Sequence, residues 1–354
     1  MNLATIIDPH PADAVALISR GRATTYGELR DQVAHLRGGL LGLGLDPGDR
    51  VAILCANNWY FVVSYLATLS AGLVAVPLNP ASPPPEVTAE LAAIGARVVI
   101  VGPAGRKIIT GVDLAAVPVL EHVVCAQGAE VADCLAFDDL LAAEPAPVVA
   151  RDDDDLAVLV FTSGTAGSPK AAMLSHGNLT SNIDQVQDHV GRAQDGDDVS
   201  FGVLPLFHIF GLNVVLGVSL RAGSAVLLIE RFDPTSALDA IALHKVTVVS
   251  GAPTMWMAWA AVPDADGSAL GTVRLATSGA AKLPLDIGER IRSRYGVEIT
   301  EGYGLTEASP VVTSAVGLAA HYGSIGVPLA GMRVRLVDAD GDDVLVGDAG
   351  EIWV

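Results

Sequence analysis

A long uncharged stretch near the N-terminus restricts the fold more than any other feature of this sequence. No charged residue occurs between Val51 and Pro85, and this exceeds the ~20 residues that cross a bilayer. Asn57, Asn58 and Pro77 interrupt the stretch, so it predicts a buried β-α-β unit rather than a membrane span. Its three elements are a strand over 51–55, a helix over 59–70 and a strand over 73–77.

The same alternation of helical and strand-like patterns continues along the chain and predicts parallel sheets. A second apolar run, 202–220, is expected to be a buried helix with its leading loop, because it contains Pro205, Gly211 and Asn213. Further strands are expected at 98–101, 156–161, 225–229, 246–250 and 273–277, with helices over 26–43 and 234–243.

The expected fold class is α/β, with two doubly wound subdomains followed by the start of a small β-barrel subdomain. A Pro/Ala-rich segment at 142–150 and four aspartates at 152–155 indicate a solvated connector. After residue 326, short strands at 333–338 and 350–354 are separated by glycine turns. The predicted subdomains are therefore 1–150, 151–325 and 326–354.

Charge and cysteine content exclude several classes of protein. The formal net charge is −19, from 21 basic and 40 acidic residues, which argues against nucleic acid as a partner. The three cysteines are widely spaced and form neither a disulfide framework nor a thiolate zinc site. The first eight residues lack the pattern of a signal peptide. A cytoplasmic location is expected; contact with a membrane surface stays open, although no basic amphipathic helix supports it.

The strongest candidate for a functional site is a loop of Gly, Ser and Thr that follows the predicted strand at 156–161. It reads FTSGTAGSPK from Phe161 to Lys170. Glycines let backbone N–H groups approach an anion, hydroxyls add donors, and Lys170, one of only four lysines, supplies positive charge. The loop lacks the Walker A spacing, which excludes a kinase-like P-loop. An ordinary surface turn has the same composition, so the loop alone leaves both interpretations open.

The loop resembles the phosphate-binding signature TSGTTGxPK of adenylate-forming enzymes, which include acyl-CoA synthetases, luciferases and peptide-synthetase adenylation domains. Other segments resemble motifs of that family in the same order along nearly the whole chain, which favours phosphate binding over a surface turn. They are TYGEL at 25–29, GDRVA at 48–52, AVPLNP at 75–80, LPLFHIFG at 204–211, SGAA at 278–281, YGLTE at 303–307, GSIGVP at 323–328 and GEI at 350–352. The resemblance is strongest to fatty acyl-CoA ligases and implies the N-terminal domain of the adenylate-forming fold.

The resemblance also implies ATP, Mg²⁺ and coenzyme A, and it assigns roles to individual residues. Thr306, Glu307 and Lys170 would be catalytic, and Glu307 with Thr165 would hold Mg²⁺, although Glu307 could equally be a plain acid at a helix start. Attack of a carboxylate on the α-phosphate needs neutralised charge rather than a protein nucleophile. The nucleotide would be bound by Thr162, Ser163, Gly164, Thr165, Gly167, Lys170, Gly279, Ala280, Ala281, Glu301, Gly302, Tyr303, Gly304 and Thr306.

The acid pocket would be bordered by Phe207, His208 and Gly302. Relatives that activate amino acids usually carry an aspartate near Phe207-His208, so this pair favours an acid without an amine. Core packing explains the nearby apolar residues as well as a fatty-acyl or aryl pocket does. These residues are Phe210, Val214, Val215, Met255 and Trp256.

Some features depart from the family pattern. Ala166 and Ala171 replace a hydroxyl residue and a glycine of the phosphate loop, and Lys282 stands where many relatives have proline. The chain ends before the family's ribose-binding residues, hinge and C-terminal lid, and no lysine follows Lys282. Because lid closure completes such a site, we expect the 354-residue chain to have little activity by itself.

The sequence therefore predicts an ATP-dependent ligase that activates a carboxylic acid, expected to be fatty, as acyl-AMP and transfers it to coenzyme A. Two alternatives stay open: an acyl-AMP ligase that delivers to a carrier protein, and a non-catalytic acyl- or nucleotide-binding module. An NAD enzyme is disfavoured because no G-x-G-x-x-G follows a predicted strand.

Overall fold

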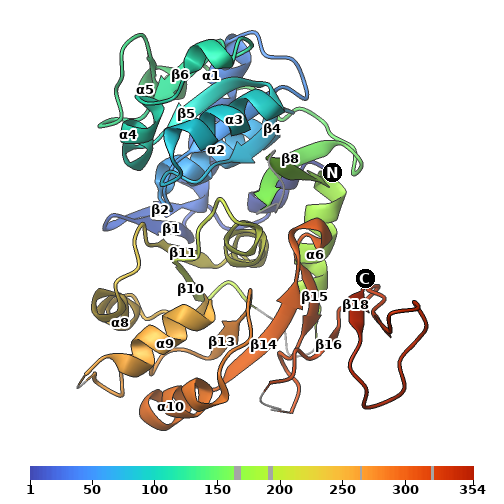
Figure 1. Cartoon of the computed structure of the whole chain (residues 1–354). Helices are drawn as coiled ribbons and strands as arrows, with labels where there is room; N and C mark the ends of the chain where they lie inside the picture. The colour runs from blue at the N-terminus through green and yellow to red at the C-terminus, as the bar shows by residue number, and fades with distance from the viewer. Residues whose placement is uncertain (163–168, 190–193, 264, 320–322) are drawn as a thin grey trace.

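The computed structural model describes residues 1–162, 169–189, 194–263, 265–319 and 323–354. Two large sheets lie one above the other in Figure 1, and a small two-stranded sheet lies beside them near the C-terminus. One continuous apolar core contacts both large sheets; it includes Val51 and Ile53 of the first and Val226 and Val249 of the second. The α/β class with mostly parallel sheets is therefore confirmed.

The seven-stranded sheet contains the predicted β-α-β unit. β3 and β4 pair in parallel, with Arg50 opposite Val74 and Ile53 opposite Pro77, and the connecting helix α2 (Trp59–Ser70) is buried over nearly its whole length. The strand order is β7-β6-β5-β3-β4-β8-β9, and only β9 is antiparallel to its neighbour. The strands are β3 (Arg50–Leu54), β4 (Val74–Pro77), β5 (Ala96–Val101), β6 (His122–Cys125), β7 (Leu135–Ala136), β8 (Leu156–Thr162) and β9 (Lys170–Ser175).

The nine-stranded sheet carries most of the predicted nucleotide motifs. Its order is β16-β15-β14-β13-β12-β10-β11-β1-β2, with antiparallel strands only at the two edges. The strands are β1 (Val15–Ser19), β2 (Arg22–Thr25), β10 (Val199–Gly202), β11 (Ala225–Leu228), β12 (Val248–Gly251), β13 (Leu275–Ser278), β14 (Ile299–Gly304), β15 (Val311–Ser314) and β16 (Val327–Pro328).

Helices cover both sheets, and their ends follow from the sequence. Helix α1 (Tyr26–Gly42) starts where predicted because Thr25 and Glu28 form a capping box, in which each side chain bonds the other residue's backbone N–H. The other helices are α3 (Pro84–Ile94), α4 (Arg106–Ile109), α5 (Phe137–Leu141), α6 (His176–Gln187), α7 (Val218–Ala222), α8 (Pro234–Leu243), α9 (Pro253–Ala261) and α10 (Leu285–Tyr295). The apolar run 202–220 contains the π-helix η4 (Phe210–Gly217), and short 3₁₀ turns are η1 (Leu3–Ile7), η2 (Pro103–Gly105), η3 (Leu114–Ala116) and η5 (Thr306–Ala308).

The two sheets do not divide at the predicted boundary near residue 150. β1 and β2 precede this point but belong to the nine-stranded sheet, whereas β8 and β9 follow it and belong to the seven-stranded sheet. The Pro/Ala-rich segment is also not a free connector, since Ala146 N donates to Ala34 O at 3.2 Å and Val149 N donates to Ser70 O at 2.8 Å. Composition correctly indicated that the segment 142–150 is irregular. It could not indicate which sheet each strand joins, because this depends on pairing between strands that are distant in the sequence.

The C-terminal strands form where predicted. β17 (Arg335–Val337) and β18 (Glu351–Trp353) pair in antiparallel fashion as a separate two-stranded sheet. That this sheet begins a β-barrel stays a prediction. Among the helices in the described ranges, none is long and apolar enough to cross a membrane.

Candidate active site

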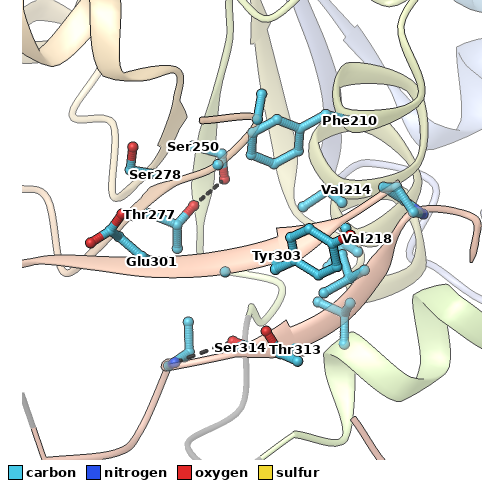
Figure 2. Close-up of a pocket in the computed structure, with 18 of the residues that line it drawn as sticks. Phe210, Val214, Val218, Ser250, Thr277, Ser278, Glu301, Tyr303, Thr313 and Ser314 are labelled. Atoms are coloured by element: carbon cyan, nitrogen blue, oxygen red, sulfur yellow. Dashed lines mark hydrogen bonds between the residues drawn. The ribbon is translucent and has the colours of Figure 1, made fainter. Parts of the chain in front are cut away.

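A cavity of about 250 Å³ lies beside the carboxyl ends of β12, β13 and β14. Figure 2 shows side chains from these strands, from β15 and from η4 directed around this space. Ligands of open parallel sheets bind at this edge because the strand ends leave a crevice there.

The segment after β13 packs closely against η4. A Cβ on Gly279 would lie 3.0 Å from the Phe210 ring, so any larger residue here would require that ring to move. Ala280 has φ of 69°, a left-handed conformation that costs about 1–3 kcal/mol in a non-glycine residue. Gly279 and Ala280 line the cavity, whereas the predicted nucleotide ligand Ala281 is exposed and does not.

The strand β14 supplies four predicted residues to the cavity wall: Glu301, Gly302, Tyr303 and Gly304. The Glu301 carboxylate accepts a hydrogen bond from Leu283 N at 3.0 Å, which ties the segment after β13 to β14. A Cβ on Gly304 would lie 2.3 Å from Pro310 O, so only glycine fits here. Figure 2 shows Tyr303 projecting from its strand into the labelled group of side chains.

The turn after β14 carries the predicted catalytic pair. Thr306 lines the cavity, whereas Glu307 lines an adjoining groove of about 560 Å³ beside helix α6. Two buried asparagines hold this turn in place. Asn182 of α6 donates to Val311 O at 2.8 Å and accepts from Val311 N at 3.1 Å. Asn213 of η4 donates to Ser309 O at 2.7 Å.

Sequence reasoning missed both asparagines as positioning residues. Asn213 interrupts an otherwise apolar run, which was a visible signal, but nothing local indicated that its partner is Ser309, 96 positions away.

The phosphate loop is described only at its two ends. Thr162 closes β8 and pairs with Lys170, the first residue of β9; Thr162 Oγ1 donates to Lys170 O at 3.4 Å. β9, the strand that follows the loop, lies against η5, and Ser175 at its far end lines the same groove as Glu307. The predicted ligands Ser163, Gly164, Thr165 and Gly167, and the departure at Ala166, fall outside the described residues.

His208 lies on the cavity wall and Phe207 does not. Phe210 N donates to His208 Nδ1 at 3.3 Å, so the ring carries its proton on Nε2. Desolvation lowers the pKa of His208, which favours the neutral ring. Of the apolar residues considered for the acid pocket, Phe210 and Val214 line the cavity, and the others are buried in the core.

Part of the cavity is polar in a way that the sequence did not indicate. Thr277 donates to Ser250 across β12 and β13, with 2.9 Å between the hydroxyl oxygens (Figure 2). Beyond this pair, His189 and Gln194 line the cavity among valines and leucines.

The oxygen ligands near the turn fit Mg²⁺ only as a partner of nucleotide phosphates. No group of three or more His, Cys, Asp or Glu side chains within the described ranges is arranged to hold a metal by itself. Mg²⁺ commonly uses one or two protein oxygens together with phosphate oxygens and water. Glu307 provides one such oxygen on the turn that contacts β9, the strand that follows the phosphate loop.

The fold and the cavity define a family. The AMP-binding enzyme family matches residues 4–354, and the chain belongs to it. The resemblance to adenylate-forming enzymes and the expected N-terminal domain fold are confirmed.

Among the relatives, a feruloyl-CoA synthase from Amycolatopsis sp is 37% identical, over 98% of this chain and 67% of its own length. The 4-coumarate–CoA ligase 5 of Oryza sativa subsp. japonica is 32% identical, over 90% of this chain and 60% of its own length.

Solved structures give the same result. The anthranilate CoA ligase AuaEII in complex with anthranoyl-AMP matches with a TM-score of 0.94 and 26% identity, over 99% of this chain and 69% of that chain. ATP-bound MatB from Rhodopseudomonas palustris matches with a TM-score of 0.88 and 30% identity, over the same shares of the two chains. The present chain therefore spans about two thirds of the length of these proteins.

Proposed function

We propose that this chain is the nucleotide-binding part of an ATP-dependent ligase that joins a carboxylic acid to coenzyme A through an acyl-AMP. One observation carries the proposal: residues from three separate family motifs line one cavity. Ala280 comes from the adenine motif, Thr306 from the YGLTE motif and His208 from the acid-site motif. Residues so far apart in sequence meet here because β13, β14 and η4 all end or begin at this edge.

In this proposal, Gly279 and Ala280 contact the adenine with their backbone, and Tyr303 packs its ring against it. Thr306 and the ends of the phosphate loop position the polyphosphate. A carboxylate oxygen of the acid attacks the α-phosphorus and pyrophosphate leaves; the thiol of coenzyme A then attacks the acyl carbon and AMP leaves. Mg²⁺, held by Glu307 and Thr165 when bound, neutralises phosphate charge. The Nε2–H of His208 donates to an oxygen of the acid carboxylate.

An aryl acid fits this proposal better than the fatty acid that the sequence suggested. Three of the four similar proteins reported above are named for ferulate, coumarate and anthranilate rather than for fatty acids. They are also named as CoA ligases or synthases, which favours coenzyme A over a carrier protein. The three cysteines are free thiols, which supports a cytoplasmic enzyme.

Acid-dependent exchange of pyrophosphate into ATP tests the proposal. Benzoate, cinnamate and fatty acids of several lengths are assayed with Mg²⁺, using the 354-residue chain and the complete product of its gene, since lid closure completes such sites. We expect Glu307→Ala to lower exchange by about 100-fold, the scale of removing a group that stabilises developing charge. Glu298→Ala is the matched control, because this exposed carboxylate precedes the opposite end of β14.

If neither protein exchanged pyrophosphate into ATP with any of the acids, the result would support the non-catalytic binding module instead. Full exchange by Glu307→Ala would remove the role proposed for this carboxylate.

A further inference from the structure

One helix lines the proposed acid pocket and also holds the turn that carries Glu307. The π-helix η4 places Phe210 and Val214 on the cavity wall (Figure 2). Asn213 belongs to the same helix, but it is not among the described residues that line the cavity or the adjoining groove. π-Helical turns are rare and frequently occur at functional sites. The contribution of Asn213 to the site can therefore come only through the groups that it bonds.

The amide of Asn213 joins two separate elements. Its Nδ2 donates to Ser309 O at 2.7 Å and to Leu179 O of α6 at 3.2 Å, which uses both amide hydrogens. The residue is only 2% exposed, so a carbonyl that lost this donor would stay buried without a partner. A Cβ on Gly217 would lie 2.8 Å from the Ile183 side chain of α6, so η4 and α6 pack closely where the amide crosses between them.

Ser309 is the residue that closes the Thr306–Glu307 turn. Its N–H donates to Thr306 O at 3.1 Å. Its φ of 73° is left-handed, a conformation that a non-glycine residue keeps only where the surrounding contacts hold it. The Asn213 amide bonds the carbonyl of this same residue. Loss of that bond would release the end of the turn, which brings Thr306 to the cavity and Glu307 to the groove.

We propose that Asn213 is a positioning residue for Mg²⁺ and the polyphosphate, although it belongs to the helix that lines the acid pocket. The inference rests on the proposed function, in which Glu307 binds Mg²⁺ and Thr306 positions the phosphates. Asn213 contacts neither ligand and acts by fixing the Ser309 backbone. Its loss should weaken the binding of Mg²⁺–ATP and spare the adenine and the acid, because these contact β13, β14 and η4 rather than Glu307.

Equilibrium binding of two ligands tests this role without requiring turnover. One is Mg²⁺–ATP; the other is 5′-O-(N-cinnamoylsulfamoyl)adenosine, a stable mimic of acyl-AMP that has neither polyphosphate nor metal. Both are titrated into the 354-residue chain by calorimetry. Asn213→Leu should bind Mg²⁺–ATP about tenfold more weakly, as the loss of one well-formed hydrogen bond allows. Its affinity for the acyl-AMP mimic should be unchanged, and chelation of Mg²⁺ should reduce the difference in ATP affinity between the variant and the wild type.

Asn2→Leu is the matched control for general destabilisation. Asn2 is also buried, and its amide also donates to two carbonyls, Leu69 O at 2.7 Å and Val149 O at 3.1 Å, but it is not among the described residues that line the cavity or the groove. This variant should lose stability in urea yet keep its affinity for Mg²⁺–ATP. Val214→Ala should give the opposite result to Asn213→Leu, with weaker binding of the acyl-AMP mimic and unchanged binding of Mg²⁺–ATP.

The outcomes separate this inference from the proposed function. If Asn213→Leu weakened both ligands equally, weakened only the acyl-AMP mimic or changed neither affinity, the inference would be overturned and the ligase proposal would stand. If this variant does not fold, Asn213→Ala decides by the same comparison, because its smaller side chain leaves room for water at the freed carbonyls. Failure of the wild-type chain to bind either ligand would count against the nucleotide site itself, and with it against both proposals.

Discussion

At the scale of single residues, His176 shows how burial far from the cavity sets the response of this chain to acid. The side chain is fully buried at the start of α6, and its Nδ1 accepts a hydrogen bond from Leu3 N at 3.0 Å. Desolvation, with smaller contributions from the positive charges of Arg151 and the N-terminus, lowers the pKa of His176 to about 4. The folded protein therefore holds this ring neutral at physiological pH.

The buried His176 should make the free energy of unfolding decrease as the pH is lowered. The unfolded chain binds the proton near pH 6.5 but the folded chain only near pH 4, so unfolding is favoured increasingly as pH falls between these values. The loss amounts to about 3 kcal/mol across this window at 1.36 kcal/mol per pKa unit. His176→Asn keeps an acceptor for Leu3 N without titrating. Urea denaturation from pH 7 to pH 4.5 should give a shallower decline for the variant; parallel curves would contradict the prediction.

At the scale of elements, Asn182 connects α6 to β15 and thereby fixes the turn that carries Thr306 and Glu307. Asn182→Leu should lower the free energy of unfolding by about 2 kcal/mol, because both backbone groups of Val311 lose their side-chain partner. Gln185→Leu is the control on the same helix; it removes the bonds of Gln185 to Ala330 O and to the Asn182 amide but leaves both Asn182–Val311 bonds in place, and it should cost less. Thermal or urea unfolding compares the two variants. Equal destabilisation would show that the Asn182–Val311 hydrogen bonds make no special contribution to stability.

The same element shows what the sequence could and could not predict. α1 and α2 were located because a helical residue pattern and the Asn and Pro residues that interrupt an apolar run are local signals. The motif residues of β14 were located through family resemblance. The partners of Asn182 and Asn213 lie 129 and 96 positions away, and no local pattern records such distances. The contacts of the Gln194 amide with Ser219 and Ser224 were missed for the same reason, since these serines lie 25 and 30 positions away.

At the scale of the whole molecule, each large sheet contains strands from both sides of residue 150. Residues 1–150 and the remainder are therefore not expected to fold separately. Asn57, in the loop that follows β3, donates to Gly202 O at 3.1 Å and Leu204 O at 2.8 Å and accepts from Leu206 N at 2.9 Å. These buried bonds join the end of the seven-stranded sheet to the end of β10 in the other sheet. Together with the shared core they cross the boundary at 150 that composition suggested.

Cooperative unfolding of both sheets follows from this arrangement. Removing residues 1–150 would strip β1 from β11, and removing the remainder would strip β8 from β4, so opening either sheet exposes strand edges and core of the other. Amide hydrogen exchange measured over increasing urea should therefore show the slowest amides of β3 and β12 merging into one unfolding isotherm. Asn57→Ala should shift that isotherm for both strands together, since the bonds it removes belong to neither sheet alone. If β3 lost protection at lower urea while β12 stayed protected, the halves would be independent domains and the sequence boundary near 150 would describe the energetics after all.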